Sequence, residues 1–295
     1  MKKDFIVISS LQKTMTLRSV IALCARLATI GTLVVSSHPA HAQLWLEPAD
    51  PNRPALTAAH AAGAVIWSHG RSVDAEDSRA PTPPYMAALR DGGWDTFRFN
   101  RARANDTLNA TAPALAQEVH KLKRQGYRRV ALAGQSFGAF LSLTAADSSA
   151  EVDAVIATAP AAYGSFSDFY DSWRDNATKL FPLLEQVRQA RVMVFFFHGD
   201  DFDPGGRGER ARDILAERHL DYVVIDQPQR LTSHWAAATP LFAQLYAGCI
   251  RAFLDASRFD IETQCKGGTL WSGTSSAPPR RMAAAPAASI QAPAR

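Results

Sequence analysis

Short apolar runs alternate with longer amphipathic stretches along the chain between about residues 60 and 257. We predict strands at 64–67, 94–99, 129–133, 152–158, 192–197 and 222–225. We predict helices at 83–90, 112–125, 139–146, 208–218 and 235–256. The run at 192–197 is apolar enough to be a central strand that is buried on both faces. Repeated strand–helix units predict an α/β fold with a doubly wound, mostly parallel sheet and helices on both faces.

The first 42 residues have the pattern of an export signal. Basic residues precede an apolar stretch at 19–35, and an Ala-x-Ala site ends at Ala42. The alternative is a membrane anchor, but Arg26 interrupts the stretch, which is too short to span a bilayer comfortably. We therefore expect cleavage after Ala42, a periplasmic or secreted product, and no stable membrane insertion.

The other end of the chain is predicted to be disordered. Residues 266–295 are rich in Ala, Pro and Ser and lack a periodic apolar pattern. Setting both ends aside leaves residues 43–265, a length that suits one domain with one hydrophobic core.

Charge is distributed unevenly along the chain. Residues 1–42 carry a net charge of +4, which equals the net charge of the whole chain, so the processed protein is neutral. The segment 266–295 carries a further +4, which leaves about −4 on residues 43–265. The basic isoelectric point thus belongs to the ends, and a nucleic-acid partner has no electrostatic support.

Two cysteines remain after the predicted cleavage. Cys24 leaves with the signal, while Cys249 and Cys265 form an even pair that an oxidising compartment could join in a disulfide. The alternative is two unpaired thiols, with Cys249 buried in a helix. Neither cysteine has the His and Cys neighbours of a metal site.

The most informative motif follows the predicted strand at 129–133. Gly134-Gln135-Ser136-Phe137-Gly138 is a Gly-x-Ser-x-Gly sequence between a strand and a small-residue helix. A serine on such a sharp turn has strained backbone angles, and glycines on either side let the strand and helix approach closely. The helix begins at the serine, so its N-terminal N–H groups face any negative charge that develops there.

These features resemble the α/β-hydrolase superfamily, and in particular its small esterases and dienelactone-hydrolase-like members, across roughly residues 60–257. The turn at Ser136, an early His69-Gly70 pair, and the order of serine, acid and histidine carry the resemblance. One departure is that only some twenty residues precede the strand at 64–67, so the antiparallel strands that usually open this fold should be short or missing.

The resemblance implies a Ser-His-Asp triad. Ser136 would be the nucleophile, and His234, just before the last predicted helix, would be the base that takes its proton. The acid should follow the strand at 192–197, where three aspartates compete. We favour Asp203, with Asp201 as the runner-up and Asp200 as the least favoured. A calcium site in this loop is the alternative, although the loop lacks an EF-hand pattern.

Two backbone amides would complete the site. In related enzymes the oxyanion is held by the N–H of the residue after the nucleophile, here Phe137, and by an amide after the first central strand. Arg71, which follows His69-Gly70, is our choice for the second donor. His69 itself is expected to have a structural role.

The resulting hypothesis is an exported serine hydrolase that cleaves small acyl esters through an acyl-enzyme, without a cofactor or metal. A peptidase or thioesterase would use the same triad, as would a cofactor-free haloperoxidase-like activity. A non-catalytic binding protein on the same fold is the alternative from another class. Aromatic residues between 163 and 181 could form a pocket wall or simply pack on the sheet. The acyl group, the alcohol and the oligomeric state are not defined by the sequence.

Overall fold

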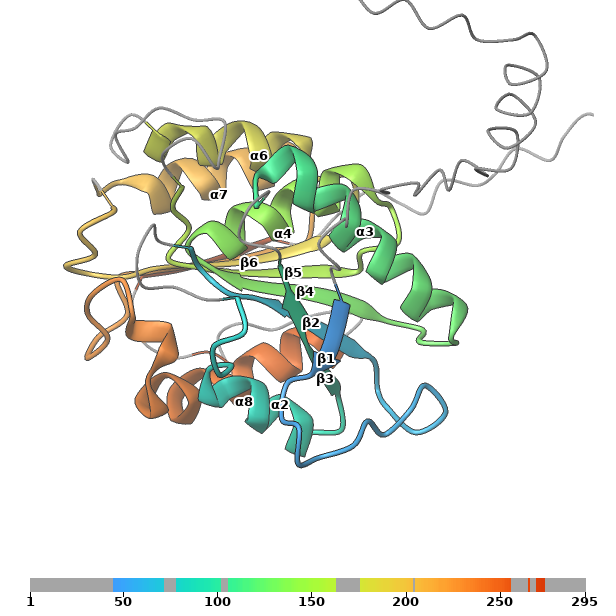
Figure 1. Ribbon diagram of the computed structural model, residues 1–295. Helices are drawn as coiled ribbons and strands as arrows, with labels where there is room; N and C mark the ends of the chain where they lie inside the picture. The colour runs from blue at the N-terminus through green and yellow to red at the C-terminus, as the bar shows by residue number, and fades with distance from the viewer. Residues whose placement is uncertain are drawn as a thin grey trace, which may run out of the picture. The chain divides into compact units, whose positions relative to one another are not determined.

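The fold is built on one open sheet, seen in Figure 1. The computed structural model describes residues 45–71, 78–101, 106–162, 176–203, 205–255, 265 and 269–273. The predicted signal at 1–42 lies outside these residues. The eight strands of the sheet lie in the order β1-β3-β2-β4-β5-β6-β7-β8. Strands β2 to β7 run parallel, while β1 and β8 pair antiparallel at the two edges.

The predicted strands are confirmed with small shifts at their ends. The strands are β1 Trp45–Pro48, β2 Ala64–Ser68, β3 Asp95–Asn100, β4 Val130–Gln135, β5 Ala154–Thr158, β6 Arg191–Phe196, β7 Tyr222–Asp226 and β8 Thr269–Gly273. The opening strand β1 is four residues long, so the antiparallel opening of the sheet is short.

Helices cover both faces of the sheet, as the strand–helix pattern predicts. The helices are α2 Pro84–Asp91, α3 Leu108–Arg124, α4 Phe137–Ser148, α6 Leu180–Gln186, α7 Arg207–Glu217 and α8 Pro240–Asp255, with 3₁₀ turns at Ala177–Lys179 and Ala236–Ala238. One layer contains α3, α4, α6 and α7, and the other contains α2 and α8 (Figure 1).

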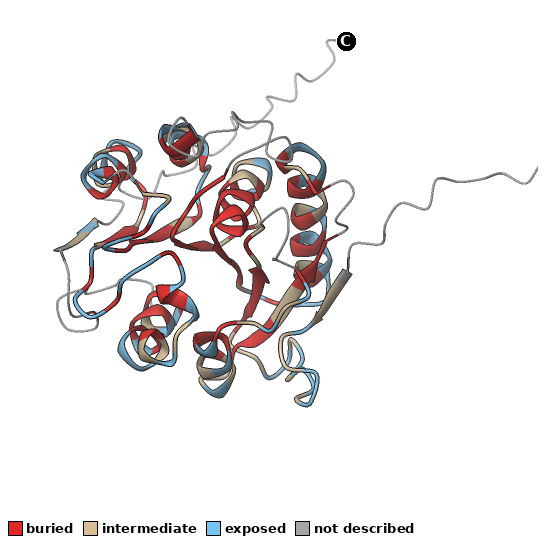
Figure 2. Cartoon of the chain, turned by 60° about the vertical axis from the view of Figure 1, so that its left-hand side comes forward, coloured by how far each residue is buried: buried red, intermediate tan, exposed pale blue. Residues whose placement is uncertain are grey.

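The period of two along each strand produces two apolar cores. In β2, Ala64 and Ile66 join the core under α3 and α4, whereas Val65 and Trp67 join the core under α2 and α8. Every residue of β2, β4 and β5 is buried. Figure 2 shows the buried sheet between helices whose outer sides are exposed. Because both faces of these strands are covered by helices, the strands appear in the sequence as continuous apolar runs.

Two segments differ from the expectations. Residues 269–273, inside the segment predicted to be disordered, form β8, which pairs with β7 and places Trp271 against the core. Leu270 and Trp271 are apolar, Thr269, Ser272 and Gly273 are polar or small, and all five residues pair with the edge strand β7. The prediction of disorder is therefore wrong for these five residues. The last helix starts later than predicted, because Thr239 is extended and Pro240 opens α8.

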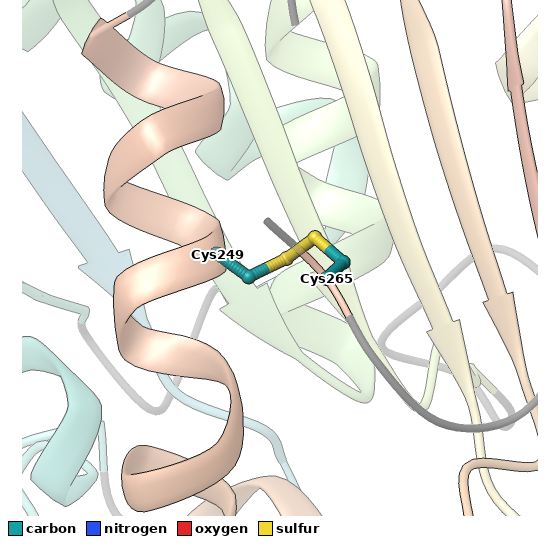
Figure 3. Close-up of a disulfide and its surroundings, with 2 residues drawn as sticks. All are labelled: Cys249 and Cys265. Atoms are coloured by element: carbon teal, nitrogen blue, oxygen red, sulfur yellow. A yellow bond between two sulfur atoms is a disulfide. The ribbon is translucent and has the colours of Figure 1, made fainter. Parts of the chain in front are cut away.

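A disulfide joins α8 to the segment that precedes β8. Cys249 of α8 is bonded to Cys265, and both residues are buried (Figure 3). The pair predicted from the even cysteine count is thus present. On a chain-entropy model, closing a loop of this length stabilises the fold by about 3 kcal/mol.

Candidate active site

Ser136 occupies a strained turn between β4 and α4. Its backbone angles are φ 57° and ψ −122°, outside the regions that L-residues ordinarily adopt, and such a conformation costs about 1–3 kcal/mol. The Ser136 N–H donates to the Thr158 carbonyl at the end of β5, which holds the turn against the sheet. The strained turn predicted from Gly-x-Ser-x-Gly is therefore present.

The two glycines of the motif are required by close backbone contacts. A Cβ on Gly134 would lie 2.1 Å from the Gly138 carbonyl oxygen, where α4 begins. A Cβ on Gly138 would lie 2.0 Å from the Ser68 carbonyl oxygen, at the end of β2. Any side chain at either position would push α4 away from the sheet. The second contact also places the first turn of α4 directly against the loop that begins at Ser68.

His234 lies in the loop between β7 and α8, as predicted, and forms a buried pair with an aspartate. Its Nδ1 lies 2.9 Å from Oδ1 of Asp200, and the two side chains are 6% and 1% exposed. The Gln135 side-chain amide donates to the His234 carbonyl at 3.2 Å. Because Gln135 precedes Ser136, this bond ties the histidine loop to the nucleophile turn.

The acid favoured on sequence spacing is not the aspartate that the structure places beside the histidine. Asp203 Oδ1 instead accepts from Arg207 Nε at 3.0 Å and from the Gly205 N–H at 2.8 Å. Asp201 is exposed. Asp200, ranked last from the sequence, is the residue that contacts His234.

Strand register explains this outcome. An isolated parallel bridge pairs His198 with Thr232, beyond the ends of β6 and β7. Two residues further along each of these two segments, the same register places Asp200 opposite His234. The Ser233 N–H donates to the His198 carbonyl and supports this pairing. The pairing of β6 with β7 thus continues past the apolar run of β6 and selects Asp200. Counting residues from Gly199, on which the sequence-based ranking of the aspartates rested, does not reveal this pairing.

Asp200 is itself held in a fixed orientation. Its Oδ1 also accepts the Phe202 N–H at 2.9 Å, and the Phe202 ring lies 4.5 Å from the His234 ring. An aspartate in this position would favour the His234 tautomer that carries its proton on Nδ1, leaving Nε2 to accept a proton. Within the described residues no hydrogen bond joins the Ser136 hydroxyl to His234; contacts of this kind often tighten only when substrate binds.

The candidate oxyanion donors come from the two segments that meet at Gly138. Phe137 is the first residue of α4, so its N–H lies at the N-terminus of this helix. The loop that contains Arg71 follows β2, whose last carbonyl lies against Gly138. Both segments predicted to supply an oxyanion amide are therefore adjacent to the nucleophile turn.

A second charged cluster lies beyond the triad candidates. Arg207 is almost fully buried, pairs with Asp203, and donates from Nη1 to the Pro160 carbonyl at 2.8 Å. Burial raises the pKa of Asp226, with a further contribution from the negative charge of Asp203. These groups hold the loop after β6 to the start of α7. Among the described residues no group of three His, Cys, Asp or Glu side chains could hold a metal ion.

Comparison with known proteins establishes the fold. No protein-family model and no curated protein sequence matches the chain. Acylaminoacyl peptidase from Pyrococcus horikoshii superposes with a TM-score of 0.53 and 13% identity, over 75% of this chain and 41% of that one. DcsB, solved in complex with its substrate analogue, superposes with a TM-score of 0.51 and 12% identity, over 67% of this chain and 91% of that one. The Pyrococcus furiosus esterase PF2001 superposes with a TM-score of 0.51 and 12% identity, over 70% of this chain and 84% of that one.

The chain therefore has the α/β-hydrolase fold, as its resemblance to that superfamily predicts. It spans about 41% of the length of the acylaminoacyl peptidase, so it corresponds to one part of that larger protein. None of the helices in the described ranges is long and apolar enough to cross a membrane.

Proposed function

We propose that this protein is an exported serine hydrolase that cleaves small acyl esters through a Ser136-His234-Asp200 triad. One observation carries the proposal: a serine in a strained strand–helix turn is tied through Gln135 to a buried, hydrogen-bonded Asp200–His234 pair. Backbone strain of about 1–3 kcal/mol is typical of active sites, which favours a catalytic role for this serine over a non-catalytic binding role.

The reaction would proceed in two halves. The Ser136 Oγ attacks the ester carbonyl while His234 Nε2 takes the hydroxyl proton, and the Asp200 carboxylate stabilises the resulting imidazolium. The Phe137 and Arg71 amides hold the oxyanion, which collapses to an acyl-enzyme as His234 protonates the departing alcohol. Water then attacks the acyl-enzyme with His234 as base, releases the acid and restores Ser136.

The same three side chains serve several classes of acyl substrate. Most of the aromatic segment between 163 and 181 lies outside the described residues. Phe181, in α6, is described, and it packs against the core on the side of the sheet that α6 covers. A peptidase or thioesterase would require the same three side chains, so the choice of leaving group has to be measured.

Active-site labelling tests the proposal. We expect a fluorophosphonate probe to modify Ser136 covalently, because such probes react with a serine whose proton a neighbouring base takes as the hydroxyl oxygen attacks. A panel of p-nitrophenyl, thioester and aminoacyl-amide substrates with matched acyl groups should show the highest kcat/KM for oxygen esters. Absence of labelling in folded protein would indicate a non-catalytic role, and a preference for amides or thioesters would assign one of the alternative activities.

Export makes a separate prediction about the processed chain. We expect the protein recovered from the producing cell to begin at Gln43 and to contain Cys249 linked to Cys265, since disulfides persist in oxidising compartments. Peptide mass mapping without reduction measures both features in one experiment. Residues 1–42 retained on the recovered protein would contradict export, and two alkylatable thiols at these positions would contradict the disulfide.

A further inference from the structure

Arg101 is a buried charged residue that the triad does not account for. It follows directly after β3, and its side chain is 1% exposed. The Arg101 N–H donates to the Ser78 hydroxyl, which in turn donates to the Arg101 carbonyl, so the backbone at this position is held on both sides. Burying a guanidinium is costly unless its N–H groups find acceptors.

Its acceptors lie in the loop after β2. Arg101 Nη1 donates to the His69 carbonyl and Nη2 donates to the Gly70 carbonyl, each at 2.9 Å. The guanidinium carbon also lies 5.5 Å from the centre of the Phe137 ring. One side chain therefore contacts both segments that would supply the oxyanion amides.

An ion pair holds the guanidinium in this orientation. Arg101 Nε donates to Asp106 Oδ2 at 2.9 Å, and the Asp106 side chain is 4% exposed. The same carboxylate pairs with Arg71 Nη1 at 3.0 Å and accepts the Thr111 hydroxyl on Oδ1. Asp106 thus links Arg101 both to Arg71, in the loop after β2, and to the first turn of α3.

The bond to Gly70 has a direct geometric consequence. The Gly70 carbonyl and the Arg71 N–H belong to one peptide unit, and in a trans peptide they point in opposite directions. Holding the carbonyl towards Arg101 fixes the direction in which the Arg71 N–H points. A charged donor on the carbonyl also polarises the peptide, which makes its N–H a stronger donor.

We propose that Arg101 is a positioning residue for the oxyanion hole. It fixes and polarises the Gly70–Arg71 peptide so that the Arg71 N–H is ready for the charge that develops on the substrate carbonyl oxygen. Catalysis of this kind depends on donors that are oriented before the reaction begins. This inference rests on the proposed hydrolase function and adds to it a residue that does not itself touch the substrate.

The test replaces the planar guanidinium of Arg101 by a lysine ammonium, which keeps the positive charge but not the arrangement of N–H donors. Arg101→Lys cannot reach both carbonyls and Asp106 together. We expect kcat for p-nitrophenyl acetate to fall about 10- to 100-fold, because a displaced donor costs somewhat less than the 10²–10³-fold of a deleted one. KM should change little, and the Ki of phenylboronic acid, which forms a tetrahedral adduct on the serine, should rise by a similar factor.

Arg129 offers a matched control. It also donates to carbonyl groups, of Ala62, Leu254 and Asp255, and stacks on the Trp94 ring, but it lies before β4, at the opposite end from Ser136. Arg129→Lys should lower the melting temperature without changing kcat or the boronate Ki. This comparison separates a positioning role from a general loss of stability.

The possible results have distinct meanings. An Arg101→Lys enzyme with kcat within twofold of the wild type, or with its loss confined to KM, would overturn the inference. If this variant does not fold, Asp106→Asn, which removes the ion pair and leaves the guanidinium, is judged by the same two measurements. Wild-type protein that neither hydrolyses esters nor labels at Ser136 would overturn the proposed function, and the inference with it.

Discussion

Ser136→Ala is expected to reduce ester hydrolysis by a factor on the order of 10⁶ while the protein keeps its fold. The substitution removes one hydroxyl from a turn whose shape depends on Gly134, Gly138 and the Thr158 carbonyl, none of which changes. His234→Ala should cost about as much, because the hydroxyl is a weak nucleophile without its base. Steady-state kinetics of both single variants and of the double variant measure the effect.

The double variant is the informative one. Residues that act as a unit in catalysis show non-additive losses, so it should be no slower than either single variant. Two variants provide matched controls that should retain full activity. Ser148→Ala lies at the end of α4, and His120→Ala changes an exposed histidine of α3 that pairs with Glu151. Losses that multiply would show that Ser136 and His234 act separately, and near-full activity of Ser136→Ala would exclude the serine mechanism.

Asp200→Asn is expected to lower kcat by a factor on the order of 10⁴, as replacement of the triad aspartate does in the best-studied case. The amide that replaces the carboxylate no longer stabilises an imidazolium and can favour the wrong tautomer of His234. Asp201→Asn, at an exposed position, should be nearly neutral.

Asp203→Asn should affect stability more than activity. Its carboxylate pairs with the buried Arg207 rather than with His234, so its loss leaves a buried guanidinium without its counter-charge. We expect a cost of about 1–3 kcal/mol in the free energy of unfolding, with kcat changed only slightly. Kinetics and denaturant unfolding of the aspartate variants measure both quantities. A large kcat loss in Asp203→Asn, with a mild effect in Asp200→Asn, would restore the ranking drawn from the sequence.

The sequence alone was sufficient for the features that depend on neighbouring residues. The strand-to-helix turn at Ser136 could be predicted because Gly134 and Gly138 lie within two residues of the serine and leave room for two backbones. The order of strands and helices could be predicted because a strand buried on both faces is a continuous apolar run. The position of His234 could be predicted because a residue between the last parallel strand and the last helix lies at the carboxyl edge of the sheet.

Only the tertiary structure decided the features that depend on distant segments. Three aspartates in one loop are equivalent in composition, and the His198–Thr232 bridge between two strands determines that Asp200 is the one facing His234. Residues 269–273 have no strand pattern of their own and become β8 because β7 offers them an open edge. Arg101 resembles any other arginine in the sequence, and its contact with the Gly70 carbonyl exists only because β3 lies beside β2 in the sheet. Backbone turns and apolar periodicity are local, whereas register, edge pairing and buried charge partners are set by which strands lie side by side.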